Sequence, residues 1–109
     1  MPYLETPLKL EQVALGGSRC VTLGGKQVGL FHTKDGLFAI DNVCPHRDAP
    51  LTDGWVKDGY VSCPWHQWQF RLTDGVCLNI PGPRVASYGV EVREGVIWVN
   101  LEAKGAKKS

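Results

Sequence analysis

The sequence lacks several features that would place the protein in a membrane, in an export pathway or on nucleic acid. No apolar run approaches the ~20 residues that a membrane-spanning helix needs. The start, MPYLETPLKL, has no basic segment followed by an apolar one, as an export signal would. Formal net charge is only +1, and without Lys104, Lys107 and Lys108 the 12 basic side chains become 9 against 11 acidic ones. Because phosphate contacts require a basic face, we expect a cytoplasmic protein that binds neither membrane nor nucleic acid.

Long helical periodicity is also missing, and turn signals take its place. Residues 7–15 come closest to a helix, but they are few and run into two glycines. Thirteen Gly and seven Pro punctuate the 109 residues, with turn dipeptides at 24–25, 35–36, 58–59, 74–75 and 94–95. Strands are predicted between them at 20–23, 27–31, 37–40, 60–62, 68–72, 88–92 and 96–99. The pattern predicts an all-β sandwich or small barrel with one helical turn near Lys9–Val13.

The length is that of one domain, which we place at residues 1–103, followed by a flexible basic tail at 104–109. Four cysteines without an export signal favour metal binding or redox chemistry over a disulfide framework. Two segments, 42–53 and 62–67, resist assignment to strands. The first contains Cys44 and His46 in the sequence CPH, and the second contains Cys63 and His66 in CPWH, with sixteen residues between His46 and Cys63.

One thiolate and one imidazole in each segment leave two kinds of metal site open. A Cys2His2 zinc finger takes its two His from a helix, and no helix is predicted here. A [2Fe–2S] centre in which two His replace two Cys on one iron fits better, because two facing loops can each give a Cys to one iron and a His to the other. The alternative from another class is a zinc-stapled interaction module.

At these residues the sequence resembles the Rieske iron–sulfur family, whose signature is Cys-x-His, a gap of about fifteen to seventeen residues, and Cys-x-x-His. The resemblance extends from Leu30 to Leu101. It implies an antiparallel β sandwich with two cluster-binding loops and one [2Fe–2S] cluster per chain. It also implies that Cys44 and Cys63 bind one iron through Sγ, and that His46 and His66 bind the other through Nδ1.

The sequence departs from the high-potential branch of that family. The two positions of that branch's loop disulfide are Ala49 and Trp65 here, and its Ser and Tyr donors are replaced by Trp68 and Phe70. Hydrogen bonds to sulfur stabilise the reduced state. Their loss predicts a potential toward the lower end of the roughly −150 to +300 mV range of Rieske centres.

The resemblance implies a one-electron carrier between a reductase and a terminal oxidoreductase. Once the two ligand histidines are assigned only His32 remains, so a mononuclear iron site of the oxygenase kind cannot be built. No dinucleotide fingerprint is present, so we expect no directly bound nucleotide and no catalytic site of its own. A redox sensor is a further hypothesis, but it would need an output domain.

Two subfamilies are similar to the chain. Residues 30–46 resemble the small subunit of NAD(P)H-dependent assimilatory nitrite reductase, a protein of nitrate assimilation. The alternative is the ferredoxin component of an aromatic-ring-hydroxylating dioxygenase, in which Thr more often follows the first Cys, where Pro45 stands here.

Other residues receive secondary predictions. Cys20 and Cys77 are expected to be buried strand residues rather than ligands. His32 is expected at an exposed strand end, Trp68 in the core, and Trp65 as a shield of the site. The remaining predictions are a loop at Pro81–Pro83 that covers the cluster and a docking rim of Arg47, Asp48, Asp53 and Lys57.

Overall fold

The computed structural model describes residues 3–43, 50–57, 59–64, 68–79 and 84–104, with side chains described as far as Leu101. Nine strands and two 3-10 turns make up the regular structure of this part. In chain order they are β1 (Tyr3–Lys9), η1 (Leu10–Gln12), β2 (Ser18–Leu23), β3 (Lys26–Thr33), β4 (Gly36–Asp41), η2 (Leu51–Asp53), β5 (Trp55–Lys57), β6 (Tyr60–Ser62), β7 (Gln69–Arg71), β8 (Ser87–Arg93) and β9 (Val96–Lys104).

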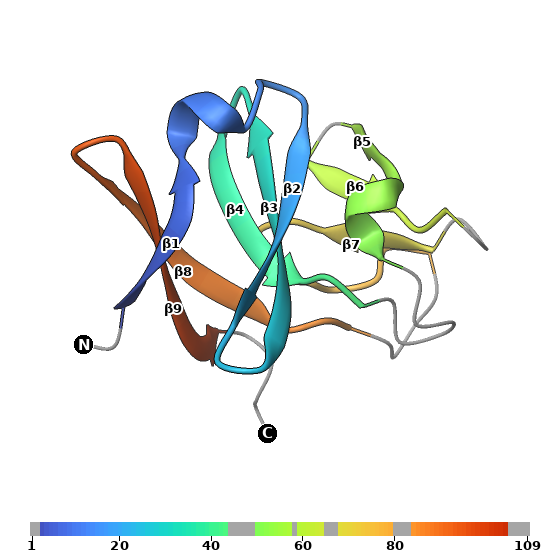
Figure 1. Ribbon diagram of the computed structural model, residues 1–109. Coiled ribbons are helices and arrows are strands. Elements are labelled where there is room, and N and C mark those ends of the chain that lie inside the picture. The colour runs from blue at the N-terminus through green and yellow to red at the C-terminus, as the bar shows by residue number, and fades with distance from the viewer. Residues whose placement is uncertain (1–2, 44–49, 58, 65–67, 80–83, 105–109) are drawn as a thin grey trace.

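The strands form two antiparallel sheets, as Figure 1 shows. Six strands make the larger sheet in the order β1-β9-β8-β4-β3-β2, and its edge strands β1 and β2 also contact each other. The smaller sheet has the order β5-β6-β7 and lies beside the larger one. The all-β antiparallel fold predicted from the sequence is confirmed.

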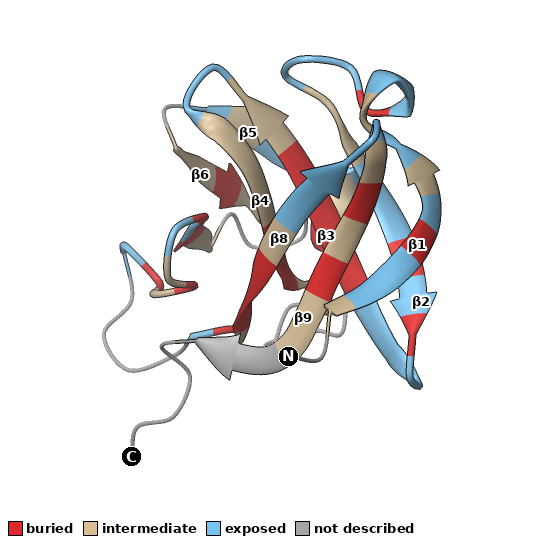
Figure 2. Cartoon of the chain, turned by 90° about the vertical axis from the view of Figure 1, so that its left-hand side faces the viewer, coloured by how far each residue is buried: buried red, intermediate tan, exposed pale blue. Residues whose placement is uncertain are grey.

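Alternation along the central strands divides the core into two clusters, because successive side chains of a strand point to opposite faces. On β3, Val28 and Leu30 belong to the cluster of the larger sheet, whereas Phe31 belongs to the cluster shared with the smaller sheet. On β4, Ala39 and Ile40 divide in the same way. Buried residues fill the middle of β3 and alternate with half-buried ones along β9, while β8 is buried only in its first half (Figure 2).

The predicted strands all occur, and η1 provides the expected helical turn near Lys9–Val13. Two strands, β1 and β5, were not predicted. β1 carries Pro7, which has no N–H to give to a ladder, and edge position lets the strand accommodate it with a register shift between Glu5 and Lys9. β5 has no fully buried side chain, so burial leaves no alternating apolar pattern along it.

The β2–β3 and β8–β9 hairpins confirm the turn signals. Gly24 and Gly25 both have positive φ, at 54° and 82°, and so do Glu94 and Gly95, at 52° and 83°. Two successive positive φ values are typical of the tight turn whose twist matches paired strands. β9 is described to Lys104, and residues 105–109 of the predicted tail lie outside the described part.

Candidate functional site

Of the four predicted ligands, Cys63 lies within the described residues, and Cys44, His46 and His66 lie outside them. The described part of the site consists of Cys63 and of the residues that flank segments 44–49, 65–67 and 80–83. No group of three or more His, Cys, Asp or Glu side chains within the described ranges could hold a metal ion.

Cys63 follows directly after β6 and is 0% exposed. Its backbone N–H donates to the carbonyl of Trp68 at 2.8 Å, one step beyond the Ser62–Gln69 pair of β6 and β7. The two ends of segment 64–67 are thereby held together. A buried thiol fits the donor chemistry of a soft metal site, because thiolates are the usual ligands of iron–sulfur clusters.

The segment that contains Cys44 and His46 is closed at its base in the same manner. Val43 and Pro50 form an antiparallel bridge. The N–H of Leu51 donates to the carbonyl of Asn42 at 2.7 Å, and the N–H of Thr52 donates to its side-chain Oδ1 at 2.8 Å. The end of β4 and the start of η2 are thus joined by backbone and side-chain hydrogen bonds.

The residues on both sides of the third segment, which contains Pro81–Pro83, are also paired with other residues of the chain. On the entering side, the N–H of Gln69 donates to Asn79 Oδ1 at 3.1 Å and the N–H of Leu78 donates to the carbonyl of Gln69 at 2.6 Å. On the leaving side, Arg84 forms a bridge with Val76. Strand β7 is therefore tied to the flanks of both the second and the third segments.

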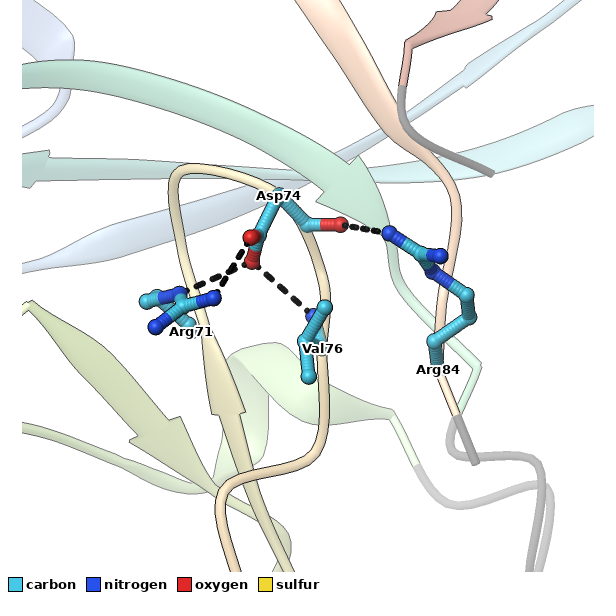
Figure 3. Close-up of polar contacts among 4 residues, drawn as sticks. All are labelled: Arg71, Asp74, Val76 and Arg84. Atoms are coloured by element: carbon cyan, nitrogen blue, oxygen red, sulfur yellow. Dashed lines mark hydrogen bonds and ion pairs between the residues drawn. The ribbon is translucent and has the colours of Figure 1, made fainter. Parts of the chain in front are cut away.

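A polar network around Asp74 reinforces this third flank (Figure 3). The Asp74 carboxylate accepts two hydrogen bonds from the Arg71 guanidinium, at 3.0 and 2.7 Å, and one from the N–H of Val76 at 3.1 Å. Arg84 Nη2 donates to the Asp74 carbonyl at 3.4 Å. The hydrogen bond and charge of Arg71 hold the pKa of Asp74 below its usual range.

All three flanks share one apolar core. Leu51 follows the first segment, Cys63 opens the second, and Cys77 and Val85 lie on either side of the third. These four side chains belong to one buried cluster, to which Phe31, Ile40, Val61, Phe70 and Leu72 also contribute. The structure therefore places the described ends of the three segments around a common packing centre.

Of the predictions for other residues, those for Trp68 and Cys77 are confirmed and that for Cys20 is wrong. Trp68 packs against this core, with its ring centroid 6.4 Å from that of Phe70, so the packing role is confirmed. Cys77 is buried as expected, but Cys20 is exposed, because its side chain falls on the outer face of edge strand β2.

His32 lies near the end of β3, as predicted, but it is half-buried rather than exposed. Its ring Nδ1–H donates to the carbonyl of Val13 at 2.8 Å, which ties the segment after η1 to the sheet. Asp53 and Lys57 are exposed. Arg47, Asp48, Trp65 and Pro81–Pro83 lie outside the described residues.

Burial also perturbs two groups near the base of the first segment. Burial raises the pKa of Asp41 at the end of β4, with the charge of Lys26 opposing the change. Burial, and next the charge of Asp41, raises the pKa of Tyr88 to about 12. Tyr88 is therefore neutral over the physiological range.

Two open cavities lie elsewhere. One of about 610 Å³ is lined by η1, residues 13–15, His32 and the β8–β9 turn. The other, of about 320 Å³, adjoins the β3–β4 turn and residues Val56, Lys57 and Gly59. Both lie at the end of the β3–β4 hairpin opposite to Asn42, so neither is the predicted metal site.

Sequence reasoning missed Asn42 and Asp74 as residues that organise the site. Asn42 has a weak signal, because a polar residue between an apolar strand and the CPH sequence is a candidate for bonding to the backbone. Asp74 has a stronger one, since Asp-Gly dipeptides frequently build turns by accepting backbone hydrogen bonds. Neither signal reveals which distant segments the side chains join.

The described part of the chain is a two-sheet antiparallel β domain in which the flanks of the Cys- and His-bearing segments share one buried cluster. Comparison with known proteins gives its family. Residues 5–100 match the family described as Rieske-like [2Fe-2S] domain, and the chain belongs to that family.

The chain is similar to a short ferredoxin subunit and to part of longer proteins. The anthranilate 1,2-dioxygenase ferredoxin subunit of Burkholderia cepacia is 36% identical over 80 residues, covering 72% of this chain and 73% of its own. Cholesterol 7-desaturase nvd of Drosophila melanogaster is 39% identical over 100 residues, which are 90% of this chain and 23% of its own. The chain spans about a quarter of the length of the first curated relatives that it matches.

Solved structures share the fold. A protein of Mycobacterium tuberculosis assigned as an NADH-dependent nitrite reductase small subunit is 32% identical, with a TM-score of 0.83 over 98% of this chain and 100% of its own. The ferredoxin of carbazole 1,9a-dioxygenase from Nocardioides aromaticivorans is 25% identical, with a TM-score of 0.84 over 92% and 98%. Within the part of the chain that the structure describes, no helix is long and apolar enough to cross a membrane.

Proposed function

We propose that the protein is a one-electron carrier that binds one [2Fe–2S] cluster through Cys44, His46, Cys63 and His66. The observation that carries this proposal is the family match over residues 5–100, which includes all four residues. A [2Fe–2S] cluster supplies one-electron oxidation and reduction without a substrate site. The chain's own residues then have to hold the ligands, exclude water and present a surface to partners.

The surroundings of Cys63 support a role of the chain in holding a ligand and excluding water from it. The thiol is fully buried in an apolar cluster, so water is kept from one ligand atom. Its backbone N–H donates to the carbonyl of Trp68, so the backbone of Cys63 is held by another backbone group rather than by a mobile side chain. A rigid, dry ligand environment is the condition for a defined potential.

For the biological partner we propose the large subunit of an NAD(P)H-dependent nitrite reductase, with this chain as the cytoplasmic small subunit. Support comes from the 32% identity and the 98% coverage shared with the Mycobacterium tuberculosis protein assigned to that role. The resemblance of residues 30–46 to such subunits points the same way.

A specific observation also favours a second candidate, the ferredoxin component of a ring-hydroxylating dioxygenase. The anthranilate 1,2-dioxygenase ferredoxin subunit is 36% identical. A solved complex of the oxygenase and ferredoxin of carbazole 1,9a-dioxygenase contains a chain similar to this one, with a TM-score of 0.84. In that case the partners would be a reductase and a terminal oxygenase.

The test is reconstitution of electron transfer with each system. The purified protein is added to a nitrite reductase large subunit with NAD(P)H and nitrite, and separately to a dioxygenase reductase and oxygenase with their aromatic substrate. We expect nitrite-dependent NAD(P)H oxidation to be restored. Restoration only of dioxygenase turnover would replace the first assignment by the second.

Two cysteine variants sharpen this test. Cys63→Ser replaces a proposed ligand, whereas Cys77→Ser replaces a thiol of the same buried cluster that is not a proposed ligand. We expect the C63S protein to lose electron transfer and the C77S protein to retain it. Equal activity of C63S and wild-type protein would contradict the proposed ligand set.

A further inference from the structure

Asn42 lies between β4 and the segment that carries Cys44 and His46, and it is 1% exposed. Its N–H donates to the carbonyl of Gln27 at 2.9 Å, which anchors it to β3. Its carbonyl accepts the N–H of Leu51 at 2.7 Å, and its Oδ1 accepts the N–H of Thr52 at 2.8 Å. One buried residue thus binds the larger sheet on one side and η2 on the other.

The packing around this side chain leaves it little freedom. A Cβ at Gly29 would lie 2.9 Å from Asn42 Oδ1 and 2.8 Å from Cε1 of Phe31. Such approaches are too short for ordinary contacts, so a glycine at position 29 makes room for the amide. Because buried interiors are close-packed, Asn42 is held in one position from the β3 side.

The hydrogen bonds of Asn42 reach the second segment through Leu51. Leu51 is 0% exposed and belongs to the same buried cluster as Cys63. The N–H bond to Asn42 fixes the backbone of Leu51, and the Leu51 side chain belongs to the buried cluster that contains Cys63. A displacement at Asn42 would therefore move the base of the first segment relative to the thiol of the second.

We infer that Asn42 is a positioning residue for the [2Fe–2S] cluster, setting the relative placement of the first ligand segment and Cys63. The inference rests on the proposed function, because it needs a cluster shared by the two segments. Residues that orient metal ligands without touching the metal affect metal affinity by roughly 10- to 100-fold when replaced.

A purely structural role would be shared by other buried side chains that accept a backbone N–H. Thr6 provides the matched case. It is 2% exposed, its Oγ1 accepts the N–H of Leu8 at 3.1 Å and donates to the carbonyl of Ile97 at 2.7 Å, and it lies on edge strand β1. Thr6→Ala should destabilise the fold without disturbing the ligand segments.

The experiment compares Asn42→Ala, Asn42→Asp and Thr6→Ala in the cluster-loaded full chain, below the melting temperature of each. The readouts are the EPR line shape of the reduced protein and the rate of cluster loss to a chelator. We expect N42A to broaden the signal and to lose its cluster about 10-fold faster or more. N42D, which keeps an oxygen acceptor for Thr52, should restore the wild-type line shape, and T6A should match wild type in both readouts.

The outcomes separate the inference from the proposed function. If the wild-type chain gives no Rieske signal, the proposed function fails. If the wild-type chain gives the signal and N42A and T6A lose their clusters at equal rates with unchanged line shapes, the carrier stands and the positioning role is overturned. Equal broadening in N42D and N42A would also overturn it, because the acceptor oxygen would then be irrelevant.

Discussion

Trp68 and Phe70 illustrate how single side chains set the properties of the proposed centre. Both pack on the buried cluster of Cys63 without offering a hydroxyl at positions where the high-potential Rieske branch has Ser and Tyr. With those hydroxyl donors gone, the reduced state loses stabilisation. We therefore expect a midpoint potential below about +100 mV, within the lower part of the Rieske range.

Phe70→Tyr tests this reasoning directly. A phenolic donor to sulfur that stabilises the reduced state tenfold raises a one-electron potential by about 59 mV. Phe31→Tyr is the control, because Phe31 is equally buried in the same cluster but belongs to β3 of the larger sheet. Redox titration followed by EPR should show a positive shift for F70Y and none for F31Y. Equal shifts would contradict donation at position 70.

Two carboxyl groups predict opposite pH effects on stability. The pKa of Asp74 is lowered by Arg71, so its contribution is present at neutral pH and is lost as the pH falls through the folded-state pKa. The pKa of Asp41 is raised by burial, so its protonated form is favoured by folding and this contribution is lost as the pH rises through the folded-state pKa.

Melting temperatures of Asp74→Asn and Asp41→Asn across the acidic range check these signs. D74N should lower the melting temperature at neutral pH, with the difference disappearing at acid pH. D41N should raise the melting temperature at neutral pH relative to its effect at acid pH. If the melting temperature of D41N instead falls further below that of the wild type toward neutral pH, the folded state stabilises the Asp41 carboxylate and the predicted sign is wrong.

At the scale of elements, the turn after β7 is the tightest point of the third flank. Gly75 has φ of 76°, and a Cβ there would lie 1.9 Å from the carbonyl oxygen of Val85. Gly95, in the β8–β9 turn, has a similar φ of 83° with no heavy atom within 4 Å of such a Cβ. Comparing substitutions at Gly75 and Gly95 therefore separates the backbone strain of a positive φ from the steric clash of an added Cβ with Val85.

Gly95→Ala should destabilise by about 1 kcal/mol, the strain of a left-handed alanine. Gly75→Ala should lose that amount and about 1–3 kcal/mol more, because the added methyl group forces Val85 and its neighbours apart. Free energies of unfolding from denaturant titrations measure both. Equal losses would mean that the turn relaxes without displacing Val85.

The elements also show where sequence reasoning reaches its limit. Central strands and the turns between them can be predicted from the sequence, because burial of one face gives an alternating pattern of apolar residues. Edge strand β1 lacks this pattern because Pro7 interrupts it, and edge strand β5 lacks it because none of its side chains is fully buried. Their pairing partners are β9 and β6. Cys20 was misjudged for a different reason, because it lies on the face of β2 opposite to the buried Val21 and Leu23.

At the scale of the whole molecule, the sequence motifs propose the candidate ligands, which stay a prediction, but they do not reveal the residues that support them. Cys44, His46, Cys63 and His66 stand at a spacing that suggests paired loops, and the family match supports that interpretation. Asn42 acts through bonds to Gln27, Leu51 and Thr52, which become neighbours only after the sheets form. Such long-range contacts have no local pattern in a single sequence.

Low-temperature EPR of the anaerobically purified, dithionite-reduced protein, with iron, sulfide and zinc counted on the same sample, tests the central claim most directly. We expect about two iron and two sulfide per chain and the spectrum of a cluster with mixed Cys and His ligation. A colourless protein that holds one zinc, even after cluster reconstitution, would contradict it and make the two segments a structural staple.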